Sequence, residues 1–398
     1  MSLFSLLFVS FLSFILSCDR YLMSSVNPEF GRGIYAGKNF KVEDIVEISP
    51  SLLVKNTFAM ENQLQYFVYA TDDEVYDAIV FGEGMMYNSL DTENLVHEWN
   101  ENKLPGFDSL YEESYTRYTS FKYTAQESIR TGEELFVNYG KDWFEQRSHS
   151  PITSSEIIKR RYSSKDLEKY GFCLSDTYIS SSSIPLAGNG LFSKKAYKKG
   201  DIVMLSPVLI LPKQDVELTI DSSLLINYCI TSNNSDVALL PISVGGMINH
   251  GGKTSNVEIM WHLESDTESY LSQSPKNLSK LNYAPLSIKY VAKKPILIGE
   301  EITVNYGIEW EKEWFKHLND LKNWNEKYFN YGHFLKPQFR KMIEAPIGMF
   351  PENFYGSYFG SDKNYNDNTK RELLKLEQTN KYIEAMNYAQ SNFDIDIN

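Results

Sequence analysis

The chain has 398 residues, of which 42% are hydrophobic and 23% are charged, a globular composition with enough length for two or three domains that each bury a core. The formal net charge of −13 at pH 7 argues against nucleic acid as the main partner, because phosphate binding needs a basic surface. An acidic surface suits a basic peptide or protein, or it serves only to keep the chain in solution.

A long apolar stretch lies near the N-terminus. Residues 3–16 are apolar apart from serines, and the first charged residue is Asp19. This stretch is shorter than the roughly 20 residues of a membrane-spanning helix and is typical of a signal peptide. We therefore predict a signal peptide at residues 1–18, cleaved near Ser17 or Cys18, a protein in the secretory pathway or outside the cell, and no stable membrane span after cleavage. The alternatives are a retained, buried segment in an intracellular protein, and a membrane anchor.

The cysteines are too few to form a metal site. If Cys18 is removed or becomes terminal, only Cys173 and Cys229 remain, whereas a zinc site needs four clustered ligands. We predict no metal. The two cysteines either form one disulfide in an oxidising compartment or remain two buried thiols, and the sequence leaves both possibilities open.

Strands dominate the predicted elements. Short runs rich in β-branched and aromatic residues, bounded by Gly, Pro or acidic turns, predict strands within residues 44–54, 133–140, 201–211 and 300–307. Helical periodicity predicts a linker helix and two later helices, at residues 154–170, 311–329 and 369–390. The sequence therefore predicts a mainly β (α+β) protein.

Two parts of the chain repeat each other. GRGIYAGKNFKVEDIVEISP at residues 31–50 aligns with GNGLFSKKAYKKGDIVMLSP at residues 188–207, with 9 of 20 positions identical. Residues 119–143 align with residues 286–310, with 13 of 25 positions identical. Unrelated segments match at roughly one position in twenty, so chance does not explain this similarity.

A third pair of segments, residues 84–99 and 245–261, lies between these blocks in the same order. We therefore predict one domain duplicated in tandem. The expected divisions are copy one at 19–150, a helical linker at 151–180, copy two at 181–316, and a helical and aromatic C-terminal region at 317–398.

Both copies contain three blocks in one order: Gly-x-Gly before a strand, Asn-His or Asn-Ser with a downstream Asn, and Gly-Glu-Glu-x-x-x-Asn-Tyr-Gly. Together these blocks resemble the SET domain, the β-clip fold of protein-lysine methyltransferases, over about residues 27–144 and 181–315. The resemblance implies transfer of a methyl group from S-adenosylmethionine to a lysine side chain of a protein or peptide with a basic segment.

The resemblance also implies cofactor-binding residues in copy two. Gly188, Asn189 and Gly190 correspond to the loop that holds the methionine part of the cofactor, and glycine lets a ligand approach the backbone closely. Asn249 and His250 correspond to residues at the adenine end, on a strand threaded beneath the C-terminal loop. The alternatives are a simple turn at the glycines and a buried, hydrogen-bonded Asn-His pair without a ligand.

Tyr306, in Asn-Tyr-Gly, is the candidate for catalysis and also contacts the cofactor in this interpretation. A lysine amine must be neutral to accept a methyl group, which at a reference pKa of about 10.4 costs roughly 4 to 5 kcal/mol at pH 7. A narrow apolar channel walled by tyrosines lowers that pKa and fixes the angle of attack. Tyr290 is a second candidate for the channel wall, or is an ordinary core aromatic.

The two copies differ at one informative position. Copy one has Ser89 where the family has His, although it keeps both glycines and the asparagines and tyrosine of the other blocks. We therefore predict that copy two is the working domain and copy one a degenerate copy. No cysteine follows Cys229, so the family's zinc segment is absent from the sequence. Candidates to close the lysine channel instead, if they are not ordinary core residues, are Trp310, Trp314, Phe315 and residues 350–360.

Three interpretations follow. The first is a protein-lysine N-methyltransferase that works through copy two. The second is a non-catalytic SET-like module that binds a protein, and the third is a methyltransferase with two active copies. The complete Gly-x-Gly, Asn-His and Asn-Tyr set of copy two favours the first. The sequence does not identify the substrate or the oligomeric state.

Overall fold

The computed structural model describes residues 18–25, 31–60, 62–71, 76–100, 120–146, 161–185, 187–218, 225–263, 268–328, 341–355, 387–389 and 391–392. Residues 1–17 of the expected signal peptide and most of the expected helix at 369–390 lie outside this part. Among the helices that are described, none combines the length and apolar character needed to cross a membrane.

Strands are the main regular element of the structure, which confirms the predicted mainly β fold. In copy one, a five-stranded sheet has the order β4 (Val68–Ala70), β5 (Tyr76–Val80), β3 (Ile45–Lys55), β8 (Ser120–Ala125) and β7 (Leu95–Trp99). Two small sheets complete this half: β10 (Phe172–Cys173), β1 (Arg20–Ser24) and β2 (Arg32–Ala36) in one, and the parallel pair β6 (Asn88–Ser89) and β9 (Phe136–Val137) in the other.

Copy two contributes most of a ten-stranded sheet. Its main path has the order β11 (Thr177–Ser181), β12 (Asn189–Ser193), β19 (Glu301–Val304), β17 (Val257–His262), β18 (Leu286–Ala292), β13 (Ile202–Pro212), β15 (Val237–Pro241), β14 (Ile230–Thr231) and β20 (Ile343–Glu344). The short strand β16 (Asn249–His250) pairs with β19 in parallel, beside this path.

The described helices are short except for α7 (Ile308–Tyr328). The α-helices are α1 (Asn56–Met60), α2 (Lys141–Gln146), α3 (Ser164–Tyr170), α4 (Lys213–Leu218), α5 (Glu268–Leu271), α6 (Pro275–Leu278) and α7 (Ile308–Tyr328). The 3-10 turns are η2 (Gln63–Tyr66), η6 (Val244–Met247), η7 (Gly252–Thr254) and η9 (Glu352–Phe354). Helix α3 lies in the predicted linker and begins at a capping box between Ser163 and Asp166. Helix α7 covers the helix predicted at 311–329 and begins three residues earlier.

One proline in each copy marks where a long strand changes its partner. Strand β3 pairs with β8 up to Pro50 and with β5 from Ser51 onward. Strand β13 makes the same change at Pro207 and Val208, between β18 and β15. A proline has no backbone N–H to donate, so this junction is a position where a strand tolerates it.

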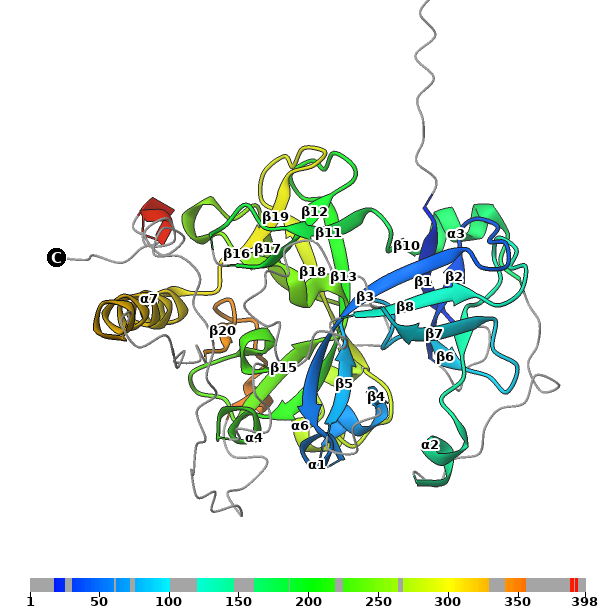
Figure 1. The fold of residues 1–398 in the computed structure, drawn as a ribbon, viewed down its shortest axis with the longest axis horizontal. Helices are drawn as coiled ribbons and strands as arrows, with labels where there is room; N and C mark the ends of the chain where they lie inside the picture. Colours follow the sequence, from blue (N-terminus) through cyan, green and yellow to red (C-terminus); the bar gives the residue numbers. More distant parts are fainter. Residues whose placement is uncertain are drawn as a thin grey trace, which may run out of the picture.

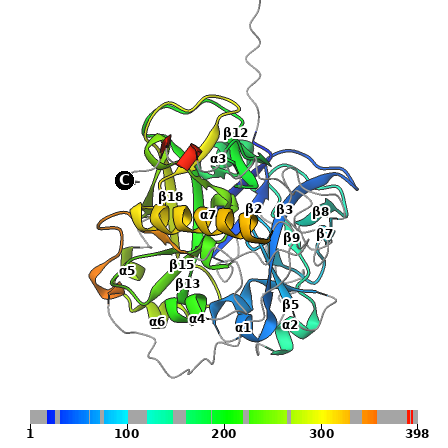
Figure 2. The same cartoon turned by 60° about the vertical axis from the view of Figure 1, so that its left-hand side comes forward.

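The two copies share a hydrophobic core. The cluster around β3 and β5 also contains residues of copy two, among them Leu209 and Leu240, and both views show these strands beside β13 and β15 (Figures 1 and 2). Gln63 of copy one is 1% exposed and donates from Nε2 to the carbonyls of Leu281 and Tyr283, at 3.1 and 3.0 Å. Its Oε1 accepts the N–H of Ile210 at 2.9 Å. The copies are therefore joined by buried contacts and not only by the linker.

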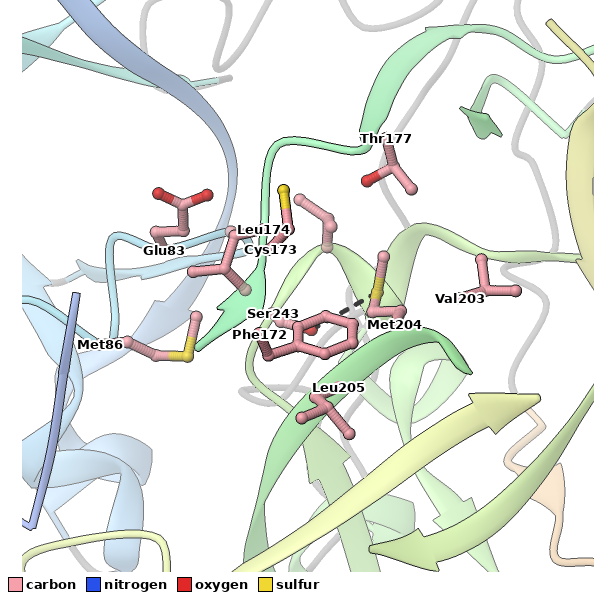
Figure 3. Close-up of a pocket in the computed structure, with 12 residues that line it drawn as sticks. Glu83, Met86, Phe172, Cys173, Leu174, Thr177, Val203, Met204, Leu205 and Ser243 are labelled. Carbon is pink, nitrogen blue, oxygen red and sulfur yellow. Dashed lines mark hydrogen bonds between the residues drawn. The ribbon is translucent and has the colours of Figure 1, made fainter. Parts of the chain in front are cut away.

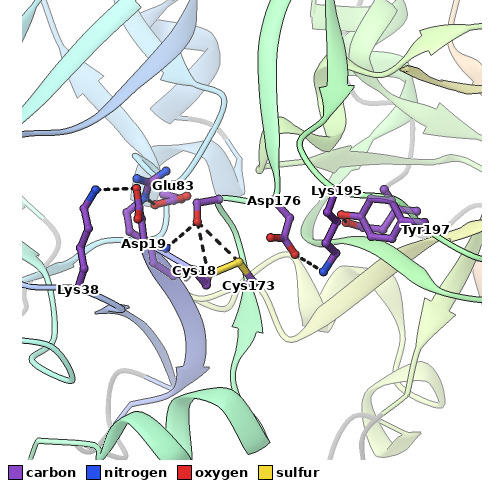
Figure 4. The surroundings of a disulfide bond; sticks show 11 residues. Cys18, Asp19, Lys38, Glu83, Cys173, Asp176, Lys195 and Tyr197 are labelled. Carbon is purple, nitrogen blue, oxygen red and sulfur yellow. Dashed lines mark hydrogen bonds and ion pairs between the residues drawn. A yellow bond between two sulfur atoms is a disulfide. The ribbon is translucent and has the colours of Figure 1, made fainter. Parts of the chain in front are cut away.

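The disulfide joins Cys18 to Cys173 (Figure 4). Cys229 is a buried free thiol. The possible bridge between Cys173 and Cys229 is thus wrong, because the chain before the first strand brings Cys18 against β10. Cys18 belongs to the folded part of the chain rather than to the expected signal segment. Spacing in sequence could not reveal this pair, since the two cysteines are 155 residues apart.

A buried charged cluster holds strand β1 next to this disulfide. The Arg20 guanidinium pairs with Glu83, and Tyr87 donates its hydroxyl to Oε2 of Glu47 at 2.8 Å. Glu47 also accepts the backbone N–H of Glu83, at 2.8 Å, and the Ser49 hydroxyl. Burial, followed by the charge of Glu83, raises the pKa of Glu47 to about 7, against the opposing effect of Arg20.

The stability of the protein should depend on the protonation of Glu47. Because its pKa is raised on folding, its contribution is fully present below its ordinary pKa of 4.5 and is lost as pH rises through about 7. We expect Glu47→Gln to flatten the fall in unfolding free energy across this range, because Gln cannot ionise. Chemical unfolding at several pH values measures this, with the exposed Glu127→Gln as the control. A profile parallel to that of the wild type would contradict the assignment.

Candidate active site

The loop at Gly188–Gly190 needs its two glycines for different reasons. Gly188 has φ of +70°, in the left-handed region that favours glycine, and the space beside its α-carbon is open. A Cβ on Gly190 would lie 2.3 Å from Oε1 of Glu301. We expected the close approach of a ligand to explain these glycines, and the structure gives other reasons: backbone conformation at Gly188 and a carboxylate of β19 at Gly190.

Asn249 ties this loop to strand β16. Its Nδ2 donates to the carbonyl of Asn189 at 2.9 Å, and to Oε1 of Glu301 and Oγ of Ser182, both at 3.1 Å. Glu301 is 8% exposed and also accepts the N–H of Ser183 at 2.8 Å. The sequence reasoning missed Glu301 and Ser182 as parts of the site. The Gly-Glu-Glu triplet that both copies share was the available signal for Glu301.

His250 uses both ring nitrogens within the protein. Nδ1 accepts the backbone N–H of Tyr306 at 2.9 Å, and Nε2 lies 3.1 Å from Oε1 of Glu311. An accepting Nδ1 carries no proton, so the proton is on Nε2 and is donated to Glu311. Burial lowers the pKa of His250, although Glu311 opposes the change, and this favours the neutral ring. The side chain of His250 therefore orients Tyr306, and neither ring nitrogen remains for a ligand.

Tyr290 and Tyr228 are close enough to Tyr306 to act on its pKa, and we call these three residues the tyrosine cluster. The hydroxyl of Tyr306 donates to the carbonyl of Ile248, and its side chain is buried. Burial, with smaller effects of Tyr290 and Tyr228, raises the pKa of Tyr306 well above its ordinary value, so the phenol is neutral. Tyr290 is 2% exposed and donates its hydroxyl to the carbonyl of Gly245 at 3.1 Å. The sequence reasoning missed Tyr228, which no motif contains.

Asn189 is the one loop residue with a polar side chain, and it is 6% exposed. Within the described residues, neither the nitrogen nor the oxygen of its side-chain amide has a hydrogen-bond partner. Buried amides normally find partners, so this one fits a loop that holds a polar ligand. The structure thus brings Gly188, Asn189, Gly190, Asn249, His250 and Tyr306 together, while their roles in binding and catalysis stay predictions.

The model of the SET domain family matches residues 31–140 and 188–307, more than half of the chain. The chain belongs to the SET domain family. No curated protein matches it significantly.

Several solved structures are similar to parts of the chain. A Plasmodium falciparum protein assigned as a histone methyltransferase has 21% identity over 32% of this chain and 97% of that chain, with a TM-score of 0.25. Polycomb Repressive Complex 2 of Chaetomium thermophilum, a humanized mutant bound to an inhibitor, has 18% identity over 39% of this chain and 19% of that chain, with a TM-score of 0.24. The chain therefore spans about a fifth of the Polycomb chain that it matches.

The SET segment of copy one keeps the hydrogen bonds of the site tyrosine but replaces the histidine and its glutamate partner. Tyr139 donates its hydroxyl to the carbonyl of Tyr87 at 2.6 Å, as Tyr306 does to Ile248. The backbone N–H of Tyr139 donates to Oγ of Ser89 at 3.0 Å, so serine replaces the acceptor that histidine provides in copy two. Phe144 stands at the position of Glu311, so the partner of the histidine is lost together with the histidine.

The Gly-x-Gly loop of copy one also has a different use. Its central residue is Arg32, whose guanidinium donates to Oγ of Ser287 in copy two. The corresponding Asn189 has no such partner among the described residues. This contact fastens the loop of copy one to copy two.

The aromatic residues that we considered as a channel closure fall into two groups. The centroid of the Trp310 ring lies 4.7 Å from that of the His250 ring and 4.9 Å from that of the Tyr306 ring, so this residue borders the site. The others are core residues: Phe350 and Phe354 are buried in the core cluster that copy two forms with the C-terminal region, and Trp314 and Phe315 pack against this cluster. Residues 356–360 lie outside the described part of the chain.

A small pocket lies between the copies (Figure 3). Its wall includes Glu83 of copy one and Met204 and Val244 of copy two. In the alignment of the copies, Met204 corresponds to Glu47 and Val244 to Glu83. Copy two therefore has apolar packing where copy one has its charged cluster, and the pocket offers no set of groups for chemistry. The described residues also include no group of three metal-binding side chains that could hold an ion.

Proposed function

We propose that the protein is an S-adenosylmethionine-dependent protein-lysine N-methyltransferase with two tandem SET copies, of which copy two does the chemistry. The observation that carries the proposal is the position of Tyr306. Its backbone is held by His250 and its hydroxyl by Ile248, and burial keeps its phenol neutral within the tyrosine cluster.

The cofactor supplies, when bound, an electrophilic methyl group on a sulfonium. The residues that would hold it are the Gly188–Gly190 loop, with the amide of Asn189, and the backbone of Asn249 and His250. Both ring nitrogens of His250 are engaged, so this residue positions the site and does not act as a base.

The tyrosine cluster supports transfer to a neutral amine. An apolar, buried surrounding lowers the pKa of a lysine amine by disfavouring its charge. The tyrosines keep their own protons because burial raises their pKa values, so no phenolate competes for the methyl group. The hydroxyl hydrogen of Tyr306 is donated to Ile248, which leaves its oxygen lone pairs to accept hydrogen bonds from the substrate.

A basic, lysine-containing protein segment is the proposed substrate, and the net charge of −13 supports it. We also propose that the protein works in the secretory pathway or outside the cell. The disulfide between Cys18 and Cys173 supports this, because disulfides persist in oxidising compartments.

Titration calorimetry with S-adenosylhomocysteine tests cofactor binding. We expect one molecule per chain, and we expect Asn189→Ala to weaken binding about fivefold, because a hydrogen bond between uncharged groups contributes about 1 kcal/mol. The matched control is Arg32→Ala, at the same loop position of copy one, which should leave the affinity unchanged.

Transfer of a labelled methyl group to proteins of a lysate, followed by identification of the labelled lysines, tests the reaction. Failure of the intact protein to bind S-adenosylhomocysteine would sink the proposal in favour of a non-catalytic protein-binding module. Binding of two molecules per chain would favour two active copies.

A further inference from the structure

Copy one places an aromatic ring against the tyrosine cluster of copy two. Phe81 directly follows strand β5 and is 1% exposed. Its ring stacks on Tyr228 with a centroid distance of 4.6 Å and an interplanar angle of 27°. The backbone N–H of Phe81 donates to the carbonyl of Pro50 at 2.7 Å, which fastens this ring to the central strand β3 of copy one.

The same ring lies against the turn that supports the other two tyrosines. A Cβ on Gly246 would lie 3.0 Å from the ring of Phe81, and a Cβ on Gly245 would lie 2.8 Å from the ring of Tyr290. The carbonyls of Gly245 and Ile248, in or beside η6, accept the hydroxyls of Tyr290 and Tyr306. The turn is therefore enclosed between a ring of copy one and the tyrosines of copy two.

The residues of this contact are not repeated in the opposite direction, from copy two to copy one. In copy one, Met85 stands at the position of Gly246, so that turn has a side chain where copy two has space for the ring of Phe81. The counterpart of Phe81 in copy two is Ile242, which cannot stack, and the counterpart of Tyr228 in copy one is Phe67. Gly246, the second residue of the Gly245-Gly246 pair, is thus explained by the ring of Phe81 in copy one.

We propose that Phe81 is a positioning residue for the tyrosine cluster, so that copy one builds part of the active site of copy two. This inference rests on the proposed function. Phe81 orients Tyr228 by stacking. It also holds the turn at Gly246, and the carbonyls on either side of Gly246 bind the hydroxyls of Tyr290 and Tyr306. Copy one thereby has a role in methyl transfer without a cofactor of its own.

Kinetics of Phe81→Leu test the proposal against Phe40→Leu, a matched loss of a buried ring in copy one. Both variants should lose comparable stability. We expect Phe81→Leu to lower kcat about 10- to 100-fold with the affinity for S-adenosylhomocysteine unchanged, because small misplacements of reacting groups have effects of this size. Phe40→Leu should keep kcat within about twofold. Equal effects of the two variants on kcat would overturn the proposal.

A compensating pair adds a second kinetic test. Gly246→Ala places a methyl group against the Phe81 ring and should lower kcat, and the double variant Gly246→Ala/Phe81→Leu should recover part of the loss relative to Gly246→Ala, because leucine leaves room for the methyl group. Additive losses in the double variant would contradict a direct contact.

Fluorine NMR of protein labelled with fluorotyrosine gives a readout that does not depend on activity. The signals of Tyr228 and Tyr306 are assigned by their loss in Tyr228→Phe and Tyr306→Phe. Phe81→Leu should shift both signals and Phe40→Leu neither, and unshifted signals in Phe81→Leu would overturn the positioning role. If the wild type transfers no methyl group while the signals shift, the proposed function fails and the contact between the copies stands.

Discussion

Tyr306→Phe should lower kcat for methyl transfer about 100-fold or more, the range typical of a hydroxyl that acts on reacting groups. The change removes the oxygen that would accept hydrogen bonds from the substrate, while the ring and the backbone contact with His250 remain. Initial rates with a labelled methyl donor measure the effect, and calorimetry with S-adenosylhomocysteine should show an affinity within about threefold of the wild type.

Tyr139→Phe is the matched control, because Tyr139 makes the same hydroxyl contact with a backbone carbonyl in copy one. Both variants leave one buried carbonyl without its donor, so both should lose about 1 to 2 kcal/mol of stability. Only Tyr306→Phe should lose activity. Substantial activity in Tyr306→Phe that disappears in the double variant would instead support two active copies.

Cys18→Ser should lower the free energy of unfolding by about 4 kcal/mol, because the disulfide closes a very long loop in the unfolded chain. The bonded cysteines are 155 residues apart and join the start of copy one to the chain that leads into copy two. Strand β1 should be the first element to loosen, since it begins two residues after Cys18 and pairs with β10, which contains Cys173.

Denaturant unfolding with and without a reductant measures this contribution. The reductant should bring the wild type to the stability of Cys18→Ser and should leave Cys18→Ser itself unchanged. Cys229→Ala should respond to the reductant as the wild type does, because Cys229 is a free thiol. Equal stabilities of the oxidised wild type and Cys18→Ser would show that the disulfide contributes nothing.

Much of the framework could be predicted because it depends on short-range patterns. The long strands β3 and β13 form at runs rich in β-branched residues, and each has a proline where it changes its partner strand. In Asn-Tyr-Gly, the side chain of Asn305 accepts the N–H of Gly307 at 2.8 Å, and Asn138 makes the same contact in copy one. Such contacts join residues two positions apart, so the local residue order is enough to produce them.

The sequence by itself determined that this chain has SET-type blocks in two places, with a complete set in copy two only. The tertiary structure alone decided which residues complete the site: Glu311 against His250, Tyr228 near enough to Tyr306 to act on its pKa, and Phe81 stacked on Tyr228. It also decided that Cys18, and not Cys229, pairs with Cys173. The physical reason is that these contacts join residues far apart along the chain. Such contacts depend on how sheets and copies pack, and a local pattern of residue types does not encode that packing.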